Sequence, residues 1–218
     1  MEEKVSVIIP AFNEEKNISK TIEIAKKGKF VDDILVINNL STDGTEEIAK
    51  NQGARVERCN FQGKGYAMEK GIQCAKNDII VFLDADVKYG NQKIVDILAT
   101  PLRMKNCDFV KSTFDRTKGG VVTEVAVKPL LKLAFPKMYN FSEPISGMIA
   151  SRKSILEKLV LEKDYGVDIG ILIDVIEQGY EVLEVNIGEI ENMSHGNKTN
   201  LTMSKMSSEI VNAIWKRI

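Results

Sequence analysis

Two aspartates at the end of an apolar run offer the clearest chemistry in this chain. Asp84 and Asp86 close the run at residues 79–83, which reads as a buried strand. Residues two positions apart in a strand point the same way, so both carboxylates can serve one point beyond the strand end. Hard carboxylate oxygens suit Mg²⁺ or Mn²⁺ carrying a diphosphate. The pair alone is weak evidence, because aspartates also begin and solvate ordinary turns.

Polar residues also follow the first two apolar runs. Pro10, Ala11, Asn13 and Glu14 end the first run, and a nucleotide base would fit on this turn. Asn13 has an alternative role as the N-cap of the next helix, since Asn is among the best capping residues. Asn38 ends the second run, and its amide can both donate to a base and accept from it.

A single lysine between glycines and a single histidine are the remaining candidates. Lys64 lies in Gly63-Lys64-Gly65, where glycines would let the backbone approach a ligand while the lysine faces a diphosphate. A solvated turn is the alternative, and the segment lacks the spacing of a P-loop. His195, the only histidine, is either structural or a ligand for an Mn²⁺-type ion.

The elements that must position these residues alternate between apolar runs and helical patterns. This alternation predicts a doubly wound α/β fold with a mostly parallel sheet, whose ligand crevice lies at the carboxyl ends of the strands. We expect a single domain over 1–218, with a nucleotide-binding half (1–100) and a second half (101–218) that includes a C-terminal helix. The expected strands are 5–10, 34–38, 54–58, 78–83, 108–112 and an edge strand at 180–187; expected later helices are 94–102 and 165–178.

Bulk composition sets limits on the class of protein. The chain has 218 residues, 44% of them hydrophobic, and a net charge of -1 from 30 basic and 31 acidic side chains. This balance provides no global field for nucleic acid. Three cysteines in no metal-ligand spacing favour reduced thiols, and no apolar run approaches the ~18 residues of a membrane span. We therefore expect a cytoplasmic protein without an integral membrane segment.

Taken together, these motifs resemble those of the family-2-type glycosyltransferases of the GT-A fold. The first-half set is Pro-Ala-x-Asn-Glu, Ser-Thr-Asp-Gly-Thr, Gly-Lys-Gly and Asp-Ala-Asp, each following an expected strand. The second half narrows the resemblance to the glucosyl-3-phosphoglycerate synthases. It rests there on residues 121–131, 143–147, 165–170 and 195–197.

The resemblance implies roles for individual residues. It assigns the nucleotide-sugar to Pro10, Ala11, Glu14, Lys64, Asp84, Tyr165 and Asp168, the metal to Asp86 and His195, and the acceptor to Thr123 and Asn197. To these we add Asn13, Asn38 and Ala85 on the donor side and Lys118, Ser146 and Gly147 on the acceptor side. Asp84, Asp86, Asp168 and Lys64 would carry the catalysis. Two positions depart from the synthases: Val121 replaces an arginine and Met148 a glutamate. Lys118 or Arg116 would then have to supply the missing cation for a phosphate-bearing acceptor.

The implied activity is metal-dependent transfer of a hexose from a nucleotide-sugar to a small anionic acceptor such as 3-phosphoglycerate. The resemblance favours UDP-glucose, Mg²⁺ or Mn²⁺, and retention of configuration, whereas the residues alone leave the base, the sugar, the acceptor and the stereochemistry open. A polyprenyl-phosphate sugar transferase and a non-catalytic nucleotide-sugar-binding protein are the alternatives. The C-terminal apolar stripe Met203, Met206, Ile210, Ala213 and Ile214 would lie on a membrane in the first alternative, and otherwise pack in the core or form a homodimer contact.

Overall fold

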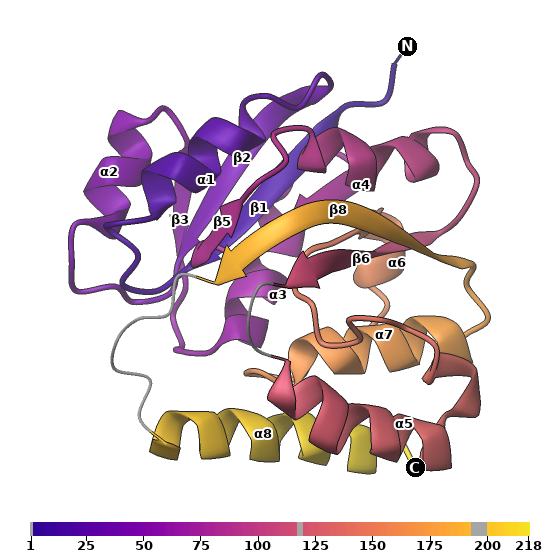
Figure 1. Cartoon of the computed structure of the whole chain (residues 1–218). Helices are drawn as coiled ribbons and strands as arrows, with labels where there is room; N and C mark the ends of the chain where they lie inside the picture. The colour runs from indigo at the N-terminus through magenta and orange to yellow at the C-terminus, as the bar shows by residue number, and fades with distance from the viewer. Residues whose placement is uncertain (1, 117–119, 193–199) are drawn as a thin grey trace.

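One continuous sheet of eight strands runs through both halves of the chain, in the order β3-β2-β1-β4-β7-β6-β8-β5 (Figure 1). The computed structural model describes residues 2–116, 120–192 and 200–218. The strands are β1 (Val5–Ala11), β2 (Val31–Asn38), β3 (Arg55–Arg58), β4 (Ile79–Phe82), β5 (Val87–Tyr89), β6 (Phe109–Arg116), β7 (Ile149–Arg152) and β8 (Val182–Asn192).

The first four strands form the parallel unit that the sequence predicted. Neighbours β3, β2, β1 and β4 pair in parallel, so their carboxyl ends share one edge. The second half differs, because β7 inserts antiparallel between β4 and β6. The expected edge strand is also longer and interior: β8 pairs in parallel with β6 and antiparallel with the short edge strand β5. Both β5 and β7 have only three or four residues, too few for a clear period-2 pattern.

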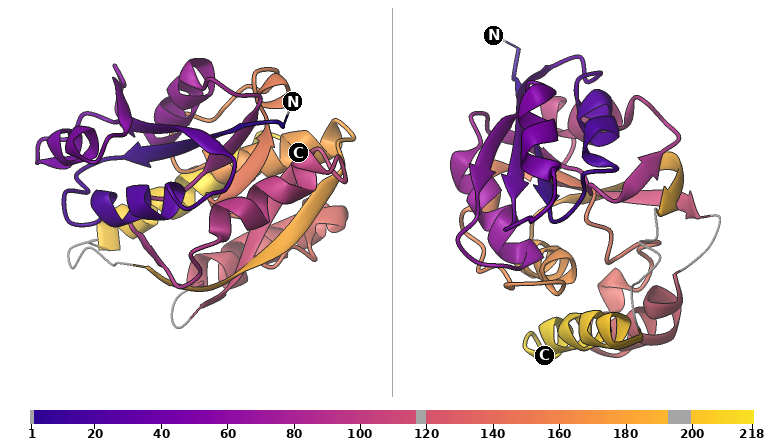
Figure 2. Two further views of the ribbon diagram at one scale, coloured as in Figure 1. Left: turned by 90° about the horizontal axis from the view of Figure 1, so that it is seen from above. Right: turned by 90° about the vertical axis from the view of Figure 1, so that its left-hand side faces the viewer.

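Helices cover both faces of the sheet (Figure 2). The helical elements are α1 (Ile18–Ala25), α2 (Thr45–Asn51), α3 (Lys64–Cys74), α4 (Ile94–Arg103), the π-helix η1 (Thr123–Val127), α5 (Lys128–Ala134), the 3₁₀-helix η2 (Pro136–Met138), α6 (Lys153–Leu156), α7 (Val167–Glu177) and α8 (Asn200–Trp215). One apolar core joins the sheet to α1 and α4. A second joins the opposite face to α3, α5, α7 and α8.

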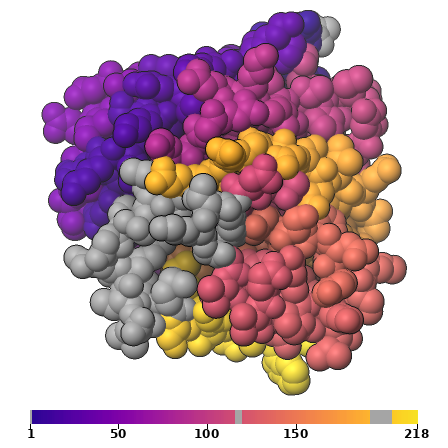
Figure 3. Space-filling view, in the orientation of Figure 1, coloured from indigo at the N-terminus to yellow at the C-terminus, as the bar shows by residue number. Residues whose placement is uncertain are grey.

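The C-terminal helix α8 packs on this second core through three residues of its apolar stripe. Ile210, Ala213 and Ile214 are 5%, 1% and 1% exposed. Gly166, just before α7, lets α8 approach closely, since a Cβ there would lie 2.7 Å from the Cβ of Ala213. Figure 3 shows the segment around residues 120–140 between β8 and α8. Within the described residues, no helix is long and apolar enough to cross a bilayer.

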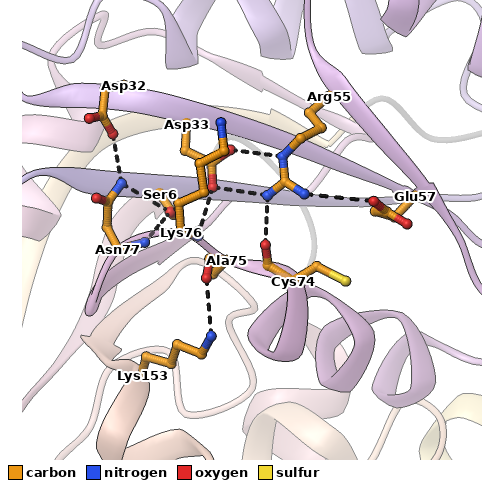
Figure 4. Close-up of polar contacts among 10 residues, drawn as sticks. All are labelled: Ser6, Asp32, Asp33, Arg55, Glu57, Cys74, Ala75, Lys76, Asn77 and Lys153. Atoms are coloured by element: carbon orange, nitrogen blue, oxygen red, sulfur yellow. Dashed lines mark hydrogen bonds and ion pairs between the residues drawn. The ribbon is translucent and has the colours of Figure 1, made fainter.

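A polar cluster fastens the opposite edge of the sheet, at the amino ends of β1, β2 and β3 (Figure 4). Asp33, only 2% exposed, accepts from Ser6 Oγ at 2.8 Å and from the backbone N–H of Lys76 at 3.1 Å. Arg55 donates to both carboxylate oxygens of Asp33 at 3.2 Å and to the Cys74 carbonyl at 2.6 Å. These bonds join three strands to the loop after α3, away from the edge that carries the candidate site.

Candidate functional site

Three charged side chains from distant parts of the chain meet at the carboxyl edge of the parallel strands. Lys64 begins α3, Asp84 follows β4, and Asp168 lies in the first turn of α7. Lys64 Nζ lies 3.0 Å from Asp84 Oδ1 and 2.7 Å from Asp168 Oδ2. The three side chains are only 19%, 21% and 7% exposed. The structure therefore brings together three of the four residues to which the sequence assigned catalysis.

Burial gives this cluster a strong internal field. Burial of Lys64 lowers its pKa, but the carboxylates of Asp168 and Asp84 outweigh that effect, and the net shift is upward. Lys64 is therefore a permanent cation at neutral pH. Burial raises the pKa of Asp168, and the Asp84 charge adds to this, while Lys64 and Lys111 act in the opposite direction.

The glycines around Lys64 admit protein backbone, which differs from the predicted approach to a ligand. A Cβ on Gly65 would lie 1.7 Å from the Glu162 carbonyl oxygen, and one on Gly63 would lie 2.4 Å from that of Lys163. Tyr66 N–H also donates to the Lys163 carbonyl at 3.2 Å. The segment before α7 thus packs directly on the first turn of α3. This contact sets the distance between Lys64 and Asp168.

Asn39 is a positioning residue, although its sequence context singled out only its neighbour Asn38. Its side chain donates to the Gly63 carbonyl at 2.7 Å and accepts from the Gly63 N–H at 3.0 Å. Its own N–H donates to the Ala11 carbonyl at 2.9 Å. Asn39 is 4% exposed and so joins the loops after β1, β2 and β3. The sequence signal that could have identified Asn39 is an amide side chain at the end of an expected strand, together with the glycine-containing turn at Gly63.

Asn38, the candidate for base recognition, is already paired within the protein. Its amide donates to Glu46 Oε2 at 2.6 Å and accepts from the Ser41 N–H at 2.9 Å. A cavity of about 470 Å³ borders Asn38 outside the Lys64 cluster. Three of the charged side chains that line it are paired with one another, since Glu46 forms ion pairs with both Lys50 and Arg58. We therefore place the candidate site at Lys64 and not at this cavity.

The turn after β1 is held by bonds to the turn after β2. Asn13 has a φ of 55° and does not cap α1, whose N-cap is Asn17. Its side chain accepts from the Thr42 N–H at 2.8 Å, and its N–H donates to Ser41 Oγ at 3.0 Å. The predicted capping alternative is therefore wrong, and Asn13 tolerates the left-handed conformation as Asn often does.

Glu14, Pro10 and Ala11 complete the same turn. Glu14 is 6% exposed, its N–H donates to Thr45 Oγ1 at 2.7 Å, and its carboxylate accepts from Asn17 Nδ2 at 2.9 Å. Ala11 is 2% exposed, and Pro10 is half-buried. A nucleotide on this turn would contact a pre-formed backbone.

The Asp84-Ala85-Asp86 turn is supported by the half-buried side chain of Tyr89. Tyr89 Oη donates to the Asp84 carbonyl at 2.6 Å. Burial raises the pKa of Tyr89, and the charges of Asp84 and Asp86 raise it further, so the hydroxyl stays protonated as a donor. Ala85 is 4% exposed, whereas Asp86 is half-buried. Tyr89 lies in the short strand β5, which the sequence pattern did not reveal.

The Ser146–Gly147 turn closes over the cluster. A Cβ on Gly147 would lie 2.3 Å from Lys64 Nζ and 2.6 Å from Asp84 Oδ1. The hydroxyls of Ser146 and Ser112 share a hydrogen bond at 2.7 Å. Only glycine therefore leaves room for the Lys64–Asp84 pair, and this turn is part of the same site.

Two buried oxygens have no hydrogen-bond partner among the described residues: Asp168 Oδ1 and Thr123 Oγ1. Thr123 is 1% exposed and opens the π-helix η1, a distortion that is frequent at functional sites. Unsatisfied buried polar atoms are expensive in a folded protein. Each is a ready hydrogen-bond partner for a substrate hydroxyl.

Among the remaining residues, some are described by the structure and others lie outside the described residues. Tyr165 is half-buried and its N–H donates to Glu209 Oε2 on α8 at 3.3 Å. Of the two departures, Val121 is 69% exposed while Met148 is 2% exposed within the apolar core. Lys118, His195 and Asn197 fall outside the described residues.

The carboxylates can hold a metal ion only in part. Within 2–116, 120–192 and 200–218, no group of three His, Cys, Asp or Glu side chains could hold a metal ion. Asp84 and Asp86 do supply hard oxygens at one strand end. Mg²⁺ is commonly bound through one or two carboxylates together with substrate phosphates and water. The donor set therefore fits a divalent ion that arrives with a diphosphate.

Comparisons with known proteins agree in pointing to one group of enzymes. A family model described as "Glycosyl transferase family 2" matches residues 6–160. The chain is similar to glucosyl-3-phosphoglycerate synthase from Petrotoga mobilis, with 34% identity over 99% of this chain and 73% of that protein. It is also similar to the Mycobacterium tuberculosis synthase, with 31% identity over 98% of this chain and 73% of that protein.

The structural comparison extends this similarity to the whole described fold. A crystal structure of the M. tuberculosis synthase, in complex with Mn²⁺, UDP-glucose and phosphoglyceric acid, matches with a TM-score of 0.91. The match has 32% sequence identity and covers 99% of this chain and 79% of that chain.

Proposed function

Because this chain belongs to glycosyl transferase family 2, has the GT-A fold and is a glycosyltransferase, we propose that it transfers glucose from UDP-glucose to 3-phosphoglycerate with Mg²⁺ or Mn²⁺. The observation that carries the proposal is the match over 99% of the chain to a synthase solved with Mn²⁺, UDP-glucose and phosphoglyceric acid. The Lys64–Asp84–Asp168 cluster lies at the strand ends where such folds bind ligands.

In the proposed reaction, the bond between the sugar C1 and the diphosphate oxygen breaks, and C1 forms a bond to an acceptor hydroxyl oxygen. UDP leaves with the electron pair of the broken bond. Lys64 is charged and pre-positioned next to Asp84, so it can stabilise the negative charge that develops on the diphosphate. Asp86 and His195 would hold a divalent ion, and Asp84 would contact the nucleotide-sugar donor. When bound, the ion would supply further charge neutralisation.

Asp168 and Thr123 are the proposed contacts to the two substrates. Asp168 Oδ2 pairs with Lys64, while Oδ1 is buried and has no hydrogen-bond partner among the described residues, which leaves it able to accept from a sugar hydroxyl. Thr123 Oγ1 would contact the acceptor, together with Ser146, Gly147 and Asn197. Val121 cannot bind a phosphate, so we propose that Lys118 supplies this cation. We expect retention of configuration, with the acceptor proton passing to the departing phosphate.

The same proposal covers the setting in which the enzyme works. We propose that residues 1–218 act as one domain, since a single sheet joins both halves. A cytoplasmic location is favoured by three unpaired cysteines. A homodimer stays a prediction, which light scattering would measure.

The test is a thermal-shift panel followed by product analysis. UDP-, GDP- and ADP-glucose would each be added with Mn²⁺ or Mg²⁺, and glucosyl transfer would then be measured with D-3-phosphoglycerate and with glycerate as the control acceptor. We expect UDP-glucose with metal to give the largest shift, and 3-phosphoglycerate to be the better acceptor. Binding without turnover on any acceptor would favour the non-catalytic alternative. Transfer only to a polyprenyl phosphate in vesicles would favour the alternative of a polyprenyl-phosphate sugar transferase.

The role of the metal has its own prediction. We expect excess chelator, Asp86→Ala and His195→Ala each to reduce transfer at least about 100-fold, since charge neutralisation by a metal supplies several kcal/mol. Titration of UDP with Mn²⁺, followed by electron paramagnetic resonance, would show bound ion in the wild type and little in either variant. Full activity in chelator would contradict the metal dependence.

A further inference from the structure

β6 carries a fully buried lysine that the proposed reaction does not use. Lys111 is 0% exposed and among the largest fully buried side chains of the protein. Within the described part of the chain, its ammonium makes one hydrogen bond, to the Ser146 carbonyl at 2.6 Å, and no ion pair. An isolated buried charge is costly, so proteins rarely place one without a function or a compensating field.

The compensating field comes from the candidate site. Asp168 on α7 and Asp84 after β4 favour the charged form of Lys111, as does Glu184, its register partner on β8, while Lys64 on α3 opposes it. Two lysines and two carboxylates thus share one buried region with no net charge among them. Among the residues that the structure describes, Lys111 is the member of this group that forms no ion pair with a carboxylate.

The hydrogen bond of Lys111 reaches the site through two residues. Its acceptor is the Ser146 carbonyl, and the next residue is Gly147, whose Cα faces Lys64 Nζ and the Asp84 carboxylate. Ser112, the next residue along β6, holds the hydroxyl of the same serine. Lys111 and Ser112, which are consecutive in β6, therefore both hydrogen-bond to Ser146 in the turn that packs on the Lys64–Asp84 pair.

We propose that Lys111 is a positioning residue, whose charged side chain holds the Ser146–Gly147 turn against Lys64 and Asp84 and so keeps both aligned toward the donor diphosphate. The inference rests on the proposed donor site at Lys64 and Asp84. It assigns to β6 a function in the reaction although this strand contributes no expected contact to the nucleotide.

The proposal has a pH signature. Burial lowers the pKa of Lys111 to about 8, partly opposed by Asp168. Above this pH the side chain loses its charge, and with it the charge-assisted hydrogen bond and the favourable charge interaction with Asp168. Donor affinity and kcat/KM should therefore fall as the pH rises through about 8. Lys64 and Tyr89 titrate higher, because their pKa values are raised.

The experiment compares Lys111→Met and Lys111→Gln with the wild type. Methionine keeps the volume and removes both charge and donor, while glutamine keeps a donor without a titrating charge. We expect kcat/KM for UDP-glucose to fall about 10- to 100-fold in Lys111→Met, as for small misplacements of catalytic groups. We also expect its Tm to stay within a few degrees of the wild type, since an apolar replacement removes a desolvation penalty. In Lys111→Gln the alkaline fall near pH 8 should disappear.

Lys153→Met is the matched control. Lys153 also bonds to backbone carbonyls, those of Gln73 at 3.2 Å and Ala75 at 3.1 Å. It lies in the polar region of Figure 4, at the other end of the sheet. Its replacement should leave kcat/KM and the pH profile unchanged.

Calorimetric binding of UDP with Mg²⁺ separates this proposal from the proposed function. If the wild type transfers no glucose, the proposed function fails, while a roughly tenfold weaker affinity for UDP in Lys111→Met still supports positioning. Wild-type affinity and pH dependence in Lys111→Met would overturn the proposal, as would an unchanged alkaline fall in Lys111→Gln. Unfolding of both variants, seen by circular dichroism, would also overturn it, because Lys111 would then be needed for the fold.

Discussion

At the scale of single residues, the site depends on side chains that are small or charged for a geometric reason. Lys64 touches two carboxylates, and Gly147 leaves room for that contact. A side chain at position 147 would crowd the Lys64–Asp84 pair, and a neutral residue at position 168 would remove the charge of the Lys64–Asp168 pair. Substitutions at these two positions therefore test separately the space around Lys64 and the negative charge beside it.

Gly147→Ala tests the space. Its Cβ would lie 2.3 Å from Lys64 Nζ, and the mobile end of that lysine would move rather than the backbone. We expect kcat/KM for the donor to fall about tenfold or more with little change in Tm. Gly44→Ala is the control, since a Cβ there meets nothing closer than 3.4 Å. Equal activity of the two variants would show that the Gly147 contact is unimportant.

Asp168→Asn tests the charge. The amide keeps the shape but cannot neutralise Lys64, whose Nζ lies 2.7 Å from Asp168 Oδ2. We expect kcat to fall about 100-fold, as when one preorganised electrostatic contact is lost. Asp174→Asn, six residues further along the same helix, breaks the pair with Arg217 at 2.7 Å instead. It should lower Tm while leaving kcat near the wild-type value, and the reverse pattern would contradict the role of Asp168.

At the scale of elements, the site forms where α3 meets the segment before α7. Tight backbone contacts at Gly63 and Gly65, together with the amide pair of Asn39, set how far α3 lies from α7. Helix α8 supports the same segment, because Lys205 pairs with Asp164 at 3.4 Å. The distance between Lys64 on α3 and Asp168 on α7 therefore depends on how these two helices pack together.

Gly65→Ala is the prediction for this docking. Alanine normally stabilises a helix by about 1 kcal/mol over glycine. Here its Cβ would lie 1.7 Å from the Glu162 carbonyl oxygen, a backbone atom that cannot yield cheaply. We expect the free energy of unfolding to fall by about 1–3 kcal/mol and transfer to fall with it. Urea denaturation would measure this, and a stabilised variant would refute the contact.

At the scale of the whole molecule, the candidate site lies at one end of the strands, and a cluster that stabilises the fold lies at the other end. The carboxyl edge carries the Lys64 cluster, while the amino edge is fastened by Asp33 and Arg55. Burial alone would raise the pKa of Asp33. Hydrogen bonds from Arg55, Ser6 and Lys76 lower this pKa by a larger amount, so the net shift is downward. Asp33 therefore stabilises the fold in its charged form.

Asp33→Asn should reduce stability without a direct effect on the site. We expect a loss of about 2 kcal/mol at pH 7, below the largest buried-pair values because the Arg55 side chain is 31% exposed. The folded pKa lies below the unfolded value of about 3.9, so this contribution is full above about pH 5 and is lost as pH falls through the folded pKa. The stability gap between variant and wild type should narrow below about pH 4, and a gap independent of pH would contradict the ionic role.

The sequence alone determined the local features of this protein. Apolar runs and helical periods identified the four parallel strands and their helices, and Asp84, Asp86 and Lys64 were found because each follows an expected strand. Such signals are readable because strand period, turn residues and strand ends depend on neighbours in the chain. They also carried the resemblance that the comparisons confirmed.

Only the tertiary structure decided which distant groups meet. The pairing of Lys64 with Asp168, the fit of Gly65 against Glu162, the antiparallel insertion of β7 and the burial of Lys111 each join segments far apart in the chain. A lysine in a strand is expected on the solvent face, and a glycine before a helix is expected in a turn. Their actual environments depend on the packing of α3, α7 and β6 around one buried charge cluster, which no local pattern encodes.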